Sequence, residues 1–225
     1  SNYDEGTFAD NGKGGIAVDG SGHIYVAGYT KSLVNPGKFP TTSGPSHIGS
    51  GDDIFVTKFS PDGSTLVYSV IIGGSGDDKA YDIAVDANGC VYVTGITASP
   101  NFPNARNSYP GTDSDAIFFW LNAGGSLMDS WYVGGSWAGD AAYAIALDSS
   151  NYAYITGYTA SRNFPTTPGV VQPRFSGGIT DAFVCKIDPS GGIIALTYLG
   201  GSLGDMTGRD NGYGIAVDNN YVYVG

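Results

Sequence analysis

The sequence predicts an all-β protein: a β-propeller built of four-stranded antiparallel blades, three full blades plus half of a fourth. The first observation is a phrase of alternating large and small residues, Ile-Ala-Val/Leu-Asp, which ends at Asp19 and recurs three times at intervals of 67, 62 and 70 residues. The second is that short β-branched and aromatic runs, bounded by turn residues, follow each copy in the same order. Such runs are typical of strands, and a phrase repeated at a near-constant interval indicates a repeat fold.

Each unit holds four runs, which we call strands A to D. Strand A is the repeated phrase, strand B follows a tight turn, strand C opens with an aspartate, and strand D closes on Gly-Gly. No stretch shows apolar residues at helical spacing. We expect residues 1–225 to form one propeller segment, with blades at 15–74, 82–135 and 144–201 and strands A and B of a fourth at 214–225.

The connections differ in length. Strands A and B are joined by short turns such as residues 20–22, and strands C and D by turns such as 61–63, where proline presets φ and glycine accepts a positive φ. The B–C connections are 22, 17 and 21 residues long, and the D–A connections are rich in glycine and aspartate. We therefore expect a plain turn face and an elaborate loop face, and we place any ligand on the loop face.

Short motifs in these connections suggest a family. Phe-Pro-Thr-Thr stands in the B–C loops at 39–42 and 164–167, and Tyr-Leu-Gly-Gly closes strand D at 198–201. In this order of phrases nearly the whole chain resembles the bacterial SBBP repeat, a seven-bladed β-propeller repeat, although the second unit departs with Phe-Pro-Asn at 102–104. Strands A and B also resemble NHL-type propeller repeats, more weakly. The resemblance implies a secreted or surface-attached bacterial protein and no particular function.

The composition restricts the partners. The net charge is −11, with only ten lysines and arginines, so nucleic acid and anionic membranes are poor partners. No apolar run approaches the length of a membrane span. Many glycines and tyrosines with few lysines favour an extracellular or cell-surface location. Cys90 and Cys185 lie at different places in the repeat, so we expect two buried free thiols rather than a disulfide.

The alternation in strand A predicts how the blades pack. Its large residues should be buried near the propeller axis: Ile16, Val18, Ile83, Val85, Ile145, Leu147, Ile215 and Val217. Its alanines should face a gap that admits only a small side chain: Ala17, Ala84, Ala146 and Ala216. Propellers usually have four to eight blades, so the two flanks of this arc need cover, and we expect further blades or neighbouring copies to supply it.

Acidic residues in the D–A connections suit calcium, which takes six to eight oxygen ligands. The calcium candidates are Asp77, Asp78, Asp140, Asp205 and Asp210. The alternative, which we favour, is that these aspartates cap turns by accepting backbone N–H groups. We therefore expect no cofactor.

Other aspartates recur in register. Those that open strand C are Asp53, Asp115 and Asp181, and those that end strand A are Asp19, Asp86, Asp148 and Asp218. A catalytic group is needed once, so we expect structural roles, such as a side-chain bond into the preceding loop. His23 and His47 belong to opposite ends of the blade, which supports neither a two-histidine metal site nor a Ser-His-Asp arrangement.

The aromatic residues offer one ligand candidate. Trp120 and Trp131 lie in strands, where we expect them to pack between blades, whereas Trp137 lies in a D–A loop. An exposed Trp137 could stack on a sugar ring, and the alternative is that it plugs the loop against a neighbouring blade. The phenylalanines of the three Phe-Pro pairs should pin their long loops to the blade.

These observations favour a non-enzymatic scaffold or binding module whose loop face engages a glycan or a protein. A second hypothesis is a polysaccharide-active hydrolase or lyase with its site at the propeller mouth, but the sequence singles out no pair of carboxylates for it. A third is a purely structural component of an extracellular array. The fold alone does not decide between them.

Overall fold

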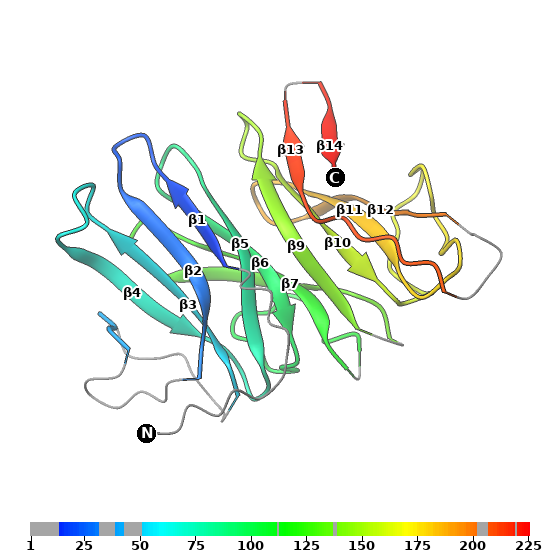
Figure 1. Ribbon diagram of the computed structural model, residues 1–225, viewed down its shortest axis with the longest axis horizontal. Coiled ribbons are helices and arrows are strands. Elements are labelled where there is room, and N and C mark those ends of the chain that lie inside the picture. The colour runs from blue at the N-terminus through cyan, green and yellow to red at the C-terminus, as the bar shows by residue number, and fades with distance from the viewer. Residues whose placement is uncertain are drawn as a thin grey trace.

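The computed structural model describes residues 14–31, 39–42, 51–111, 113–136, 139–201, 207–218 and 220–225. Every regular element in these ranges is a β-strand, and the strands form three four-stranded antiparallel sheets and one two-stranded sheet. The sheets follow one another as the blades of an arc that does not close (Figure 1). The predicted all-β fold with four-stranded blades is therefore confirmed.

Within each sheet the strands lie in chain order, so they are strands A to D of one blade. Blade 1 comprises β1 (Gly15–Val18), β2 (Ile24–Thr30), β3 (Asp53–Phe59) and β4 (Leu66–Ile72). Blade 2 comprises β5 (Asp78–Val85), β6 (Val91–Thr97), β7 (Asp115–Leu121) and β8 (Leu127–Val133). Blade 3 comprises β9 (Asp140–Leu147), β10 (Ala153–Thr159), β11 (Asp181–Ile187) and β12 (Ile193–Leu199). Half-blade 4 comprises β13 (Ile215–Val217) and β14 (Val222–Val224).

Strand A is the inner strand of each blade. The strands β1, β5, β9 and β13 contact one another in succession, and β5, β9 and β13 also pack on strand B of the blade before them. Among the described residues no helix is long and apolar enough to cross a membrane.

The turns adopt the predicted chemistry. A residue with positive φ stands in every described turn between strands A and B or C and D of blades 1 to 3: Gly22, Gly89, Asn151, Gly63, Gly125 and Gly191. At Gly191 a second constraint applies, because a Cβ there would lie 1.9 Å from Cη2 of Trp131. Glycine is thus required at this turn for both its φ and its size.

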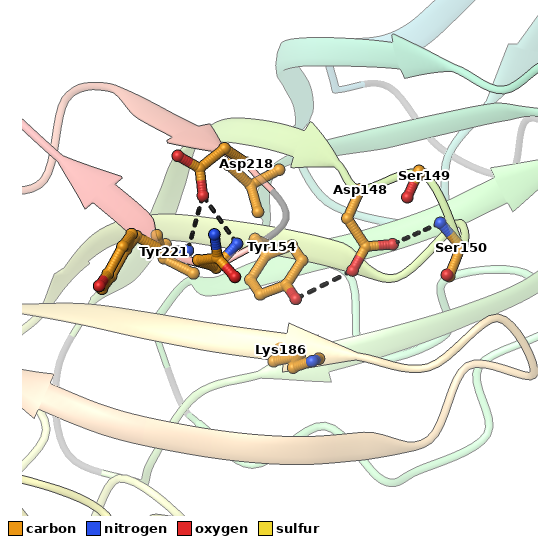
Figure 2. Close-up of a pocket in the computed structure, with 10 residues that line it drawn as sticks. Asp148, Ser149, Ser150, Tyr154, Lys186, Asp218 and Tyr221 are labelled. Atoms are coloured by element: carbon orange, nitrogen blue, oxygen red, sulfur yellow. Dashed lines mark hydrogen bonds between the residues drawn. The ribbon is translucent and has the colours of Figure 1, made fainter.

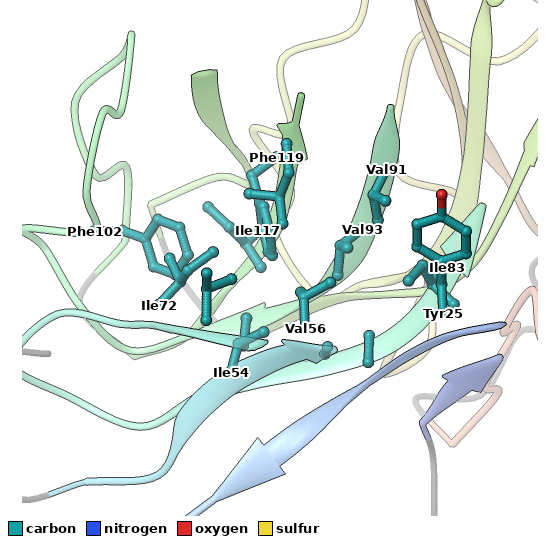
Figure 3. Packing of buried hydrophobic residues seen from close by; sticks show 14 of the residues in the cluster. Tyr25, Ile54, Val56, Ile72, Ile83, Val91, Val93, Phe102, Ile117 and Phe119 are labelled. Atoms are coloured by element: carbon teal, nitrogen blue, oxygen red, sulfur yellow. The ribbon is translucent and has the colours of Figure 1, made fainter. Parts of the chain in front are cut away.

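Two hydrophobic clusters fill the spaces between blades. In the first, Tyr25, Ile54 and Val56 of blade 1 meet Ile83 and Val93 of blade 2 (Figure 3). The second joins blades 2 and 3 in the same way and contains Trp131, with Trp120 packed against it. The core is therefore inter-blade, as the sequence predicted for the two tryptophans.

The alternation of strand A holds inside the arc and fails at its ends. Ile83 and Ile145 point toward the preceding blade and are 5% and 6% exposed, but Ile16 and Val18 are 70% and 58% exposed. The prediction that Ile16 and Val18 are buried is wrong for the described residues, because none of them forms a blade on this side of β1. Of the other large residues, Val85, Leu147, Ile215 and Val217 are half-buried.

The alanines point the opposite way, toward the following blade. Ala17 packs against the first cluster and Ala84 against the second. Ala146 is half-buried, whereas Ala216 is exposed. The expectation of a crowded gap is wrong at Ala216, since no blade follows half-blade 4 in this structure.

Strand A also begins earlier than its phrase predicts. The strands β5 and β9 start at Asp78 and Asp140, which pair with Thr97 and Thr159 of strand B. A bulge at the fourth residue of each strand lets the extra residues fit, since a bulge adds one residue to one strand of a pair. Residues that the sequence places in a D–A connection therefore belong to the inner strand.

The B–C loops cover the outer edge of each blade. Thr42 N–H donates to the Ser69 carbonyl of β4 and Thr167 N–H to the Leu196 carbonyl of β12, both at 3.0 Å, while Ala105 forms the corresponding bridge in blade 2. These loops provide hydrogen-bond partners for backbone groups of strand D, an edge strand that could otherwise pair with another chain. The phenylalanine rings of the Phe-Pro pairs contact strand C, at centroid distances of 4.8 Å for Phe39–Phe55, 5.7 Å for Phe102–Phe119 and 5.0 Å for Phe164–Phe183. The predicted pinning of the loops is confirmed.

Both cysteines are free thiols. Cys185 is buried as expected, but Cys90 is only half-buried because it leads strand β6 beside the turn.

Candidate functional site

At the loop face, an aspartate that opens strand C lies beside an aspartate that opens strand A of the next blade or, for half-blade 4, precedes that strand. Both carboxyl groups sit against the first glycine of the Gly-Gly pair. A Cβ on Gly134 would lie 1.9 Å from Asp115 Oδ1 and 2.8 Å from Asp140 Oδ2, so only glycine fits. The three pairs, each with its glycine, are Asp53–Asp78 at Gly73, Asp115–Asp140 at Gly134 and Asp181–Asp210 at Gly200.

The second aspartate of each pair caps the Gly-Gly turn. The Gly74 N–H donates to Asp78 Oδ2 at 2.7 Å, the Gly135 N–H to Asp140 Oδ2 at 2.8 Å and the Gly201 N–H to Asp210 Oδ2 at 2.9 Å. Hydroxyls of Thr97 and Ser99 also donate to Asp78. Burial nevertheless raises the pKa of Asp78 to about 6, against the effect of these donors.

The calcium candidates do not form a cage. Three of them are these caps, and Asp77 Oδ1 accepts the Asp52 N–H at 3.0 Å; Asp205 lies outside the described residues. Donors point hydrogen atoms at oxygens that calcium would need as ligands. In the described part of the chain no three histidine, cysteine or acidic side chains are grouped to hold a metal, and the expectation of no cofactor stays a prediction.

The strand-C members bond into the preceding B–C loop, as predicted. Asp115 Oδ2 accepts the Gly111 N–H at 3.2 Å, and Asp181 Oδ2 accepts the Ser176 N–H at 2.7 Å. These repeated contacts explain why an aspartate opens strand C in blades 2 and 3.

A pocket of about 460 Å³ lies on the loop face between blades 2 and 3. Its lining contains no carboxylate, imidazole or amine: Asn107, Pro110, Tyr132, Gly134, Gly135, Ser136, Asn163, Pro165, Thr167 and Ile193. The Asn107 side chain is held by Tyr132 N and O at 3.0 and 2.9 Å, and Asn163 Oδ1 accepts the Ser136 N–H at 3.1 Å. The walls are therefore fixed before any ligand arrives.

The Tyr132 hydroxyl fixes the loop behind this pocket. It accepts the Phe102 N–H at 2.9 Å and donates to the Ser99 carbonyl at 2.8 Å. Tyr198 makes the same two bonds, to Phe164 and Ser161, in blade 3. One buried tyrosine thus anchors each of these two B–C loops.

Two charged pockets lie at the opposite end, on the turn face, where the sequence predicted a plain surface. One, of about 430 Å³, lies between the A–B turns of blades 1 and 2 and is lined by Asp19, His23, Lys58 and Asp86 among others. The other, of about 250 Å³, lies between blade 3 and half-blade 4 and contains Asp148, Lys186, Asp218 and Tyr221 (Figure 2).

The carboxylates of these pockets are already used by their own turns. Asp148 accepts the Ser150 N–H at 2.8 Å and the Tyr154 hydroxyl at 3.0 Å (Figure 2). Asp19 makes the same kinds of bond to Ser21 and Tyr25, both at 2.9 Å. Because four repeats share this arrangement, the aspartates that end strand A stabilise the turns, as predicted.

The lysines of the turn face come from strand C. Lys58 Nζ lies 3.9 Å from Asp19 Oδ2, and Lys186 Nζ lies over the Tyr152 ring at 4.5 Å. In blade 2 the same position holds Trp120, which stacks on Tyr92 at a centroid distance of 6.2 Å. Lysine is the sixth residue of strand C in blades 1 and 3. Aligning the three copies of strand C would therefore have indicated from the sequence that this position can carry a positive charge.

Of the two histidines and the loop tryptophan considered from the sequence, only His23 lies among the described residues. His23 contacts Asp19 in the A–B turn, with Nδ1 3.0 Å from Oδ2. Trp137, the sequence candidate for ligand binding, lies outside the described residues, as does His47. The Trp137 prediction therefore stays a prediction.

Fold and sites together define a repeat-based binding or scaffold module of the β-propeller type. A model of the SBBP β-propeller repeat matches residues 67–103 and 130–165. Each matched stretch runs from strand D of one blade, through the Gly-Gly pair and strands A and B of the next, to its Phe-Pro motif. No curated protein sequence matches the chain.

Proposed function

We propose that this protein is a non-enzymatic, secreted or cell-surface binding module that holds a neutral glycan on its loop face, between blades 2 and 3. The pocket of about 460 Å³ carries this proposal. Proline and tyrosine surfaces beside fixed amide groups suit the apolar faces and hydroxyls of a sugar. The net charge of −11 disfavours polyanionic ligands.

A hydrolase or lyase site receives less support. The acid pair nearest the pocket is Asp115–Asp140, and both side chains are fully buried behind Gly134. Glycoside hydrolysis needs two carboxyl groups that flank an accessible sugar. The same pair also recurs at the other blade boundaries, which indicates a scaffold role.

A blocking substitution tests the proposal. Ser136→Tyr should fill the pocket, whereas Ser75→Tyr makes the same change at the equivalent position of blade 1, where Ser75 N–H bonds to Asn101 as Ser136 N–H bonds to Asn163. Binding of a soluble β-glucan, a galactan and polygalacturonate would be measured by calorimetry. We expect a neutral polysaccharide to bind, with affinity at least about tenfold weaker for Ser136→Tyr, a loss of about 1.4 kcal/mol, and unchanged for Ser75→Tyr. Binding of none of the neutral polymers, or equal loss in both variants, would contradict the proposal.

A further inference from the structure

A pair of buried acids joins blades 2 and 3. Asp115 at the start of β7 and Asp140 at the start of β9 are both 0% exposed, and both carboxyl groups face Gly134, where an added Cβ would lie 1.9 Å from Asp115 Oδ1 and 2.8 Å from Asp140 Oδ2. Among the described residues no donor forms a hydrogen bond with Oδ1 of either side chain. Two ionised carboxylates in contact would repel strongly in an environment that solvent does not screen.

The donors around the pair are unevenly placed. Asp140 Oδ2 accepts the Gly135 N–H at 2.8 Å and the Ser161 hydroxyl at 3.1 Å, which stabilises its ionised form. Asp115 accepts only the longer bond from Gly111, at 3.2 Å. Asp140 is therefore the better place for the negative charge, and Asp115 for a proton.

We propose that Asp115 and Asp140 share one proton and act as a pH-dependent clamp between blades 2 and 3. In the clamped state the Asp115 carboxylic acid donates its O–H to the Asp140 carboxylate. When Asp115 loses this proton to solvent, two negative charges face each other across the blade boundary and the clamp is lost. The proposal is independent of any ligand on the loop face.

The surroundings favour the shared proton. Burial first, and then the charge of Asp140, raise the pKa of Asp115 above its ordinary value. The titratable groups that interact with the pair come from the B–C loop, β8, β10 and β12: Asp113, Tyr109, Tyr132, Tyr158 and Tyr198. Asp78 acts on Tyr109 and Tyr132 as well, and the cation Arg209 acts on Tyr158. The immediate neighbours are acidic or phenolic, so none of them supplies a positive charge in place of the proton.

The same design recurs at the other boundaries. Burial raises the pKa of Asp78 with a contribution from the charge of Asp53, and burial raises the pKa of Asp181 with a contribution from Asp210. At the first boundary the chain neighbours of the pair form an ion pair of their own, with Lys79 Nζ 3.3 Å from Asp52 Oδ2. The Asp115–Asp140 pair is therefore the clearest one to test.

The sign of the pH effect follows from linkage. A carboxyl group with a raised pKa holds its proton in the folded state after the unfolded chain has released it, above about pH 4. Stability therefore falls as the pH rises from about 4 through the raised pKa. Asp115→Asn keeps a hydrogen-bond donor for Asp140 but has no proton that titrates. It should therefore remove this contribution to the dependence of folding stability on pH.

The test compares thermal unfolding of the 225-residue chain with that of Asp115→Asn between about pH 5 and pH 9. Asp113→Asn is the matched control, because Asp113 is an exposed aspartate on the same loop. We expect the melting temperature of the wild type and of Asp113→Asn to fall by several degrees over this range, and that of Asp115→Asn to fall less. At neutral pH the infrared spectrum of the wild type should show a protonated carboxylic acid, which Asp113→Asn keeps and Asp115→Asn loses.

Three results would overturn the clamp. The first is a wild-type spectrum without a protonated carboxylic acid at neutral pH, which decides the matter even if Asp115→Asn fails to fold. The second is the same pH slope in the wild type and Asp115→Asn. The third is a rise in melting temperature with calcium chloride that Asp115→Asn abolishes, since the pair would then hold a cation in place of the proton.

Discussion

Ile16 and Ile83 occupy the same position of strand A in successive blades, yet Ile16 is 70% exposed and Ile83 is 5% exposed. The difference lies in what precedes them. Ile83 packs in one cluster with Tyr25 and Val56 of blade 1, whereas no described residue forms a blade over Ile16. Each blade thus carries a surface made to receive another blade, and the inner blades show how that surface is used.

Overpacking the inner gap should destabilise the arc. Ala84 packs against the cluster between blades 2 and 3, so Ala84→Leu should cost about 1–3 kcal/mol of unfolding free energy. Ala216→Leu is the matched control, because Ala216 is exposed at the same position of half-blade 4, and it should change stability by less than about 0.5 kcal/mol. Urea unfolding of dilute protein measures both; equal effects would contradict the packing described here.

The buried tyrosine behind each B–C loop should matter more than an exposed one. Tyr198→Phe leaves the Phe164 N–H and the Ser161 carbonyl without their partner, which should cost about 1–3 kcal/mol. Tyr223→Phe removes a hydroxyl that donates to Asp218 at an exposed site and should cost less. Limited proteolysis within residues 160–180 provides a second measurement, and an intact loop in Tyr198→Phe would argue against the anchor.

The turn face should respond to acid in the opposite direction from the buried pairs. Although burial opposes the shift, hydrogen bonds from His23, Tyr25 and Ser21 lower the pKa of Asp19 to about 2. A lowered carboxyl pKa stabilises the fold above about pH 4, and this contribution is lost as the pH falls through the lowered value. Asp19→Asn should therefore destabilise the chain at neutral pH, with a difference that shrinks toward about pH 2. A difference that stays constant with pH would show that the charge of Asp19 has no part in the turn.

The sequence was sufficient for the parts of the fold that depend on local chemistry. The turn residues Gly63 and Gly89 adopt the positive φ that their spacing predicted, and Phe102 and Phe164 pin their loops as expected. Each of these features depends on a short motif within one blade. Because the motif recurs in several repeats, the sequence alone is enough to recognise it.

Features that depend on two blades were not predicted. Asp115 and Asp140 each appeared as a separate structural or calcium-binding residue, because nothing in a single repeat shows that strand C of one blade meets strand A of the next. Strand A starts at Asp78 only because a bulge near Tyr81 restores its register with strand B. The turn-face pocket with Lys186 was missed for the same reason, since Asp148 and Asp218 come from neighbouring blades.

The central claim is that the flank of β1 is a blade-receiving surface, and sedimentation velocity tests it most directly. The 225-residue chain at micromolar concentration should associate, because Ile16 and Val18 at one end and Tyr221 and Tyr223 at the other are exposed and such apolar flanks bind another surface. Ile16→Lys should reduce this association without lowering the stability of the dilute chain. A single monomeric species across the concentration range, with a cooperative melt and no effect of Ile16→Lys, would contradict the account.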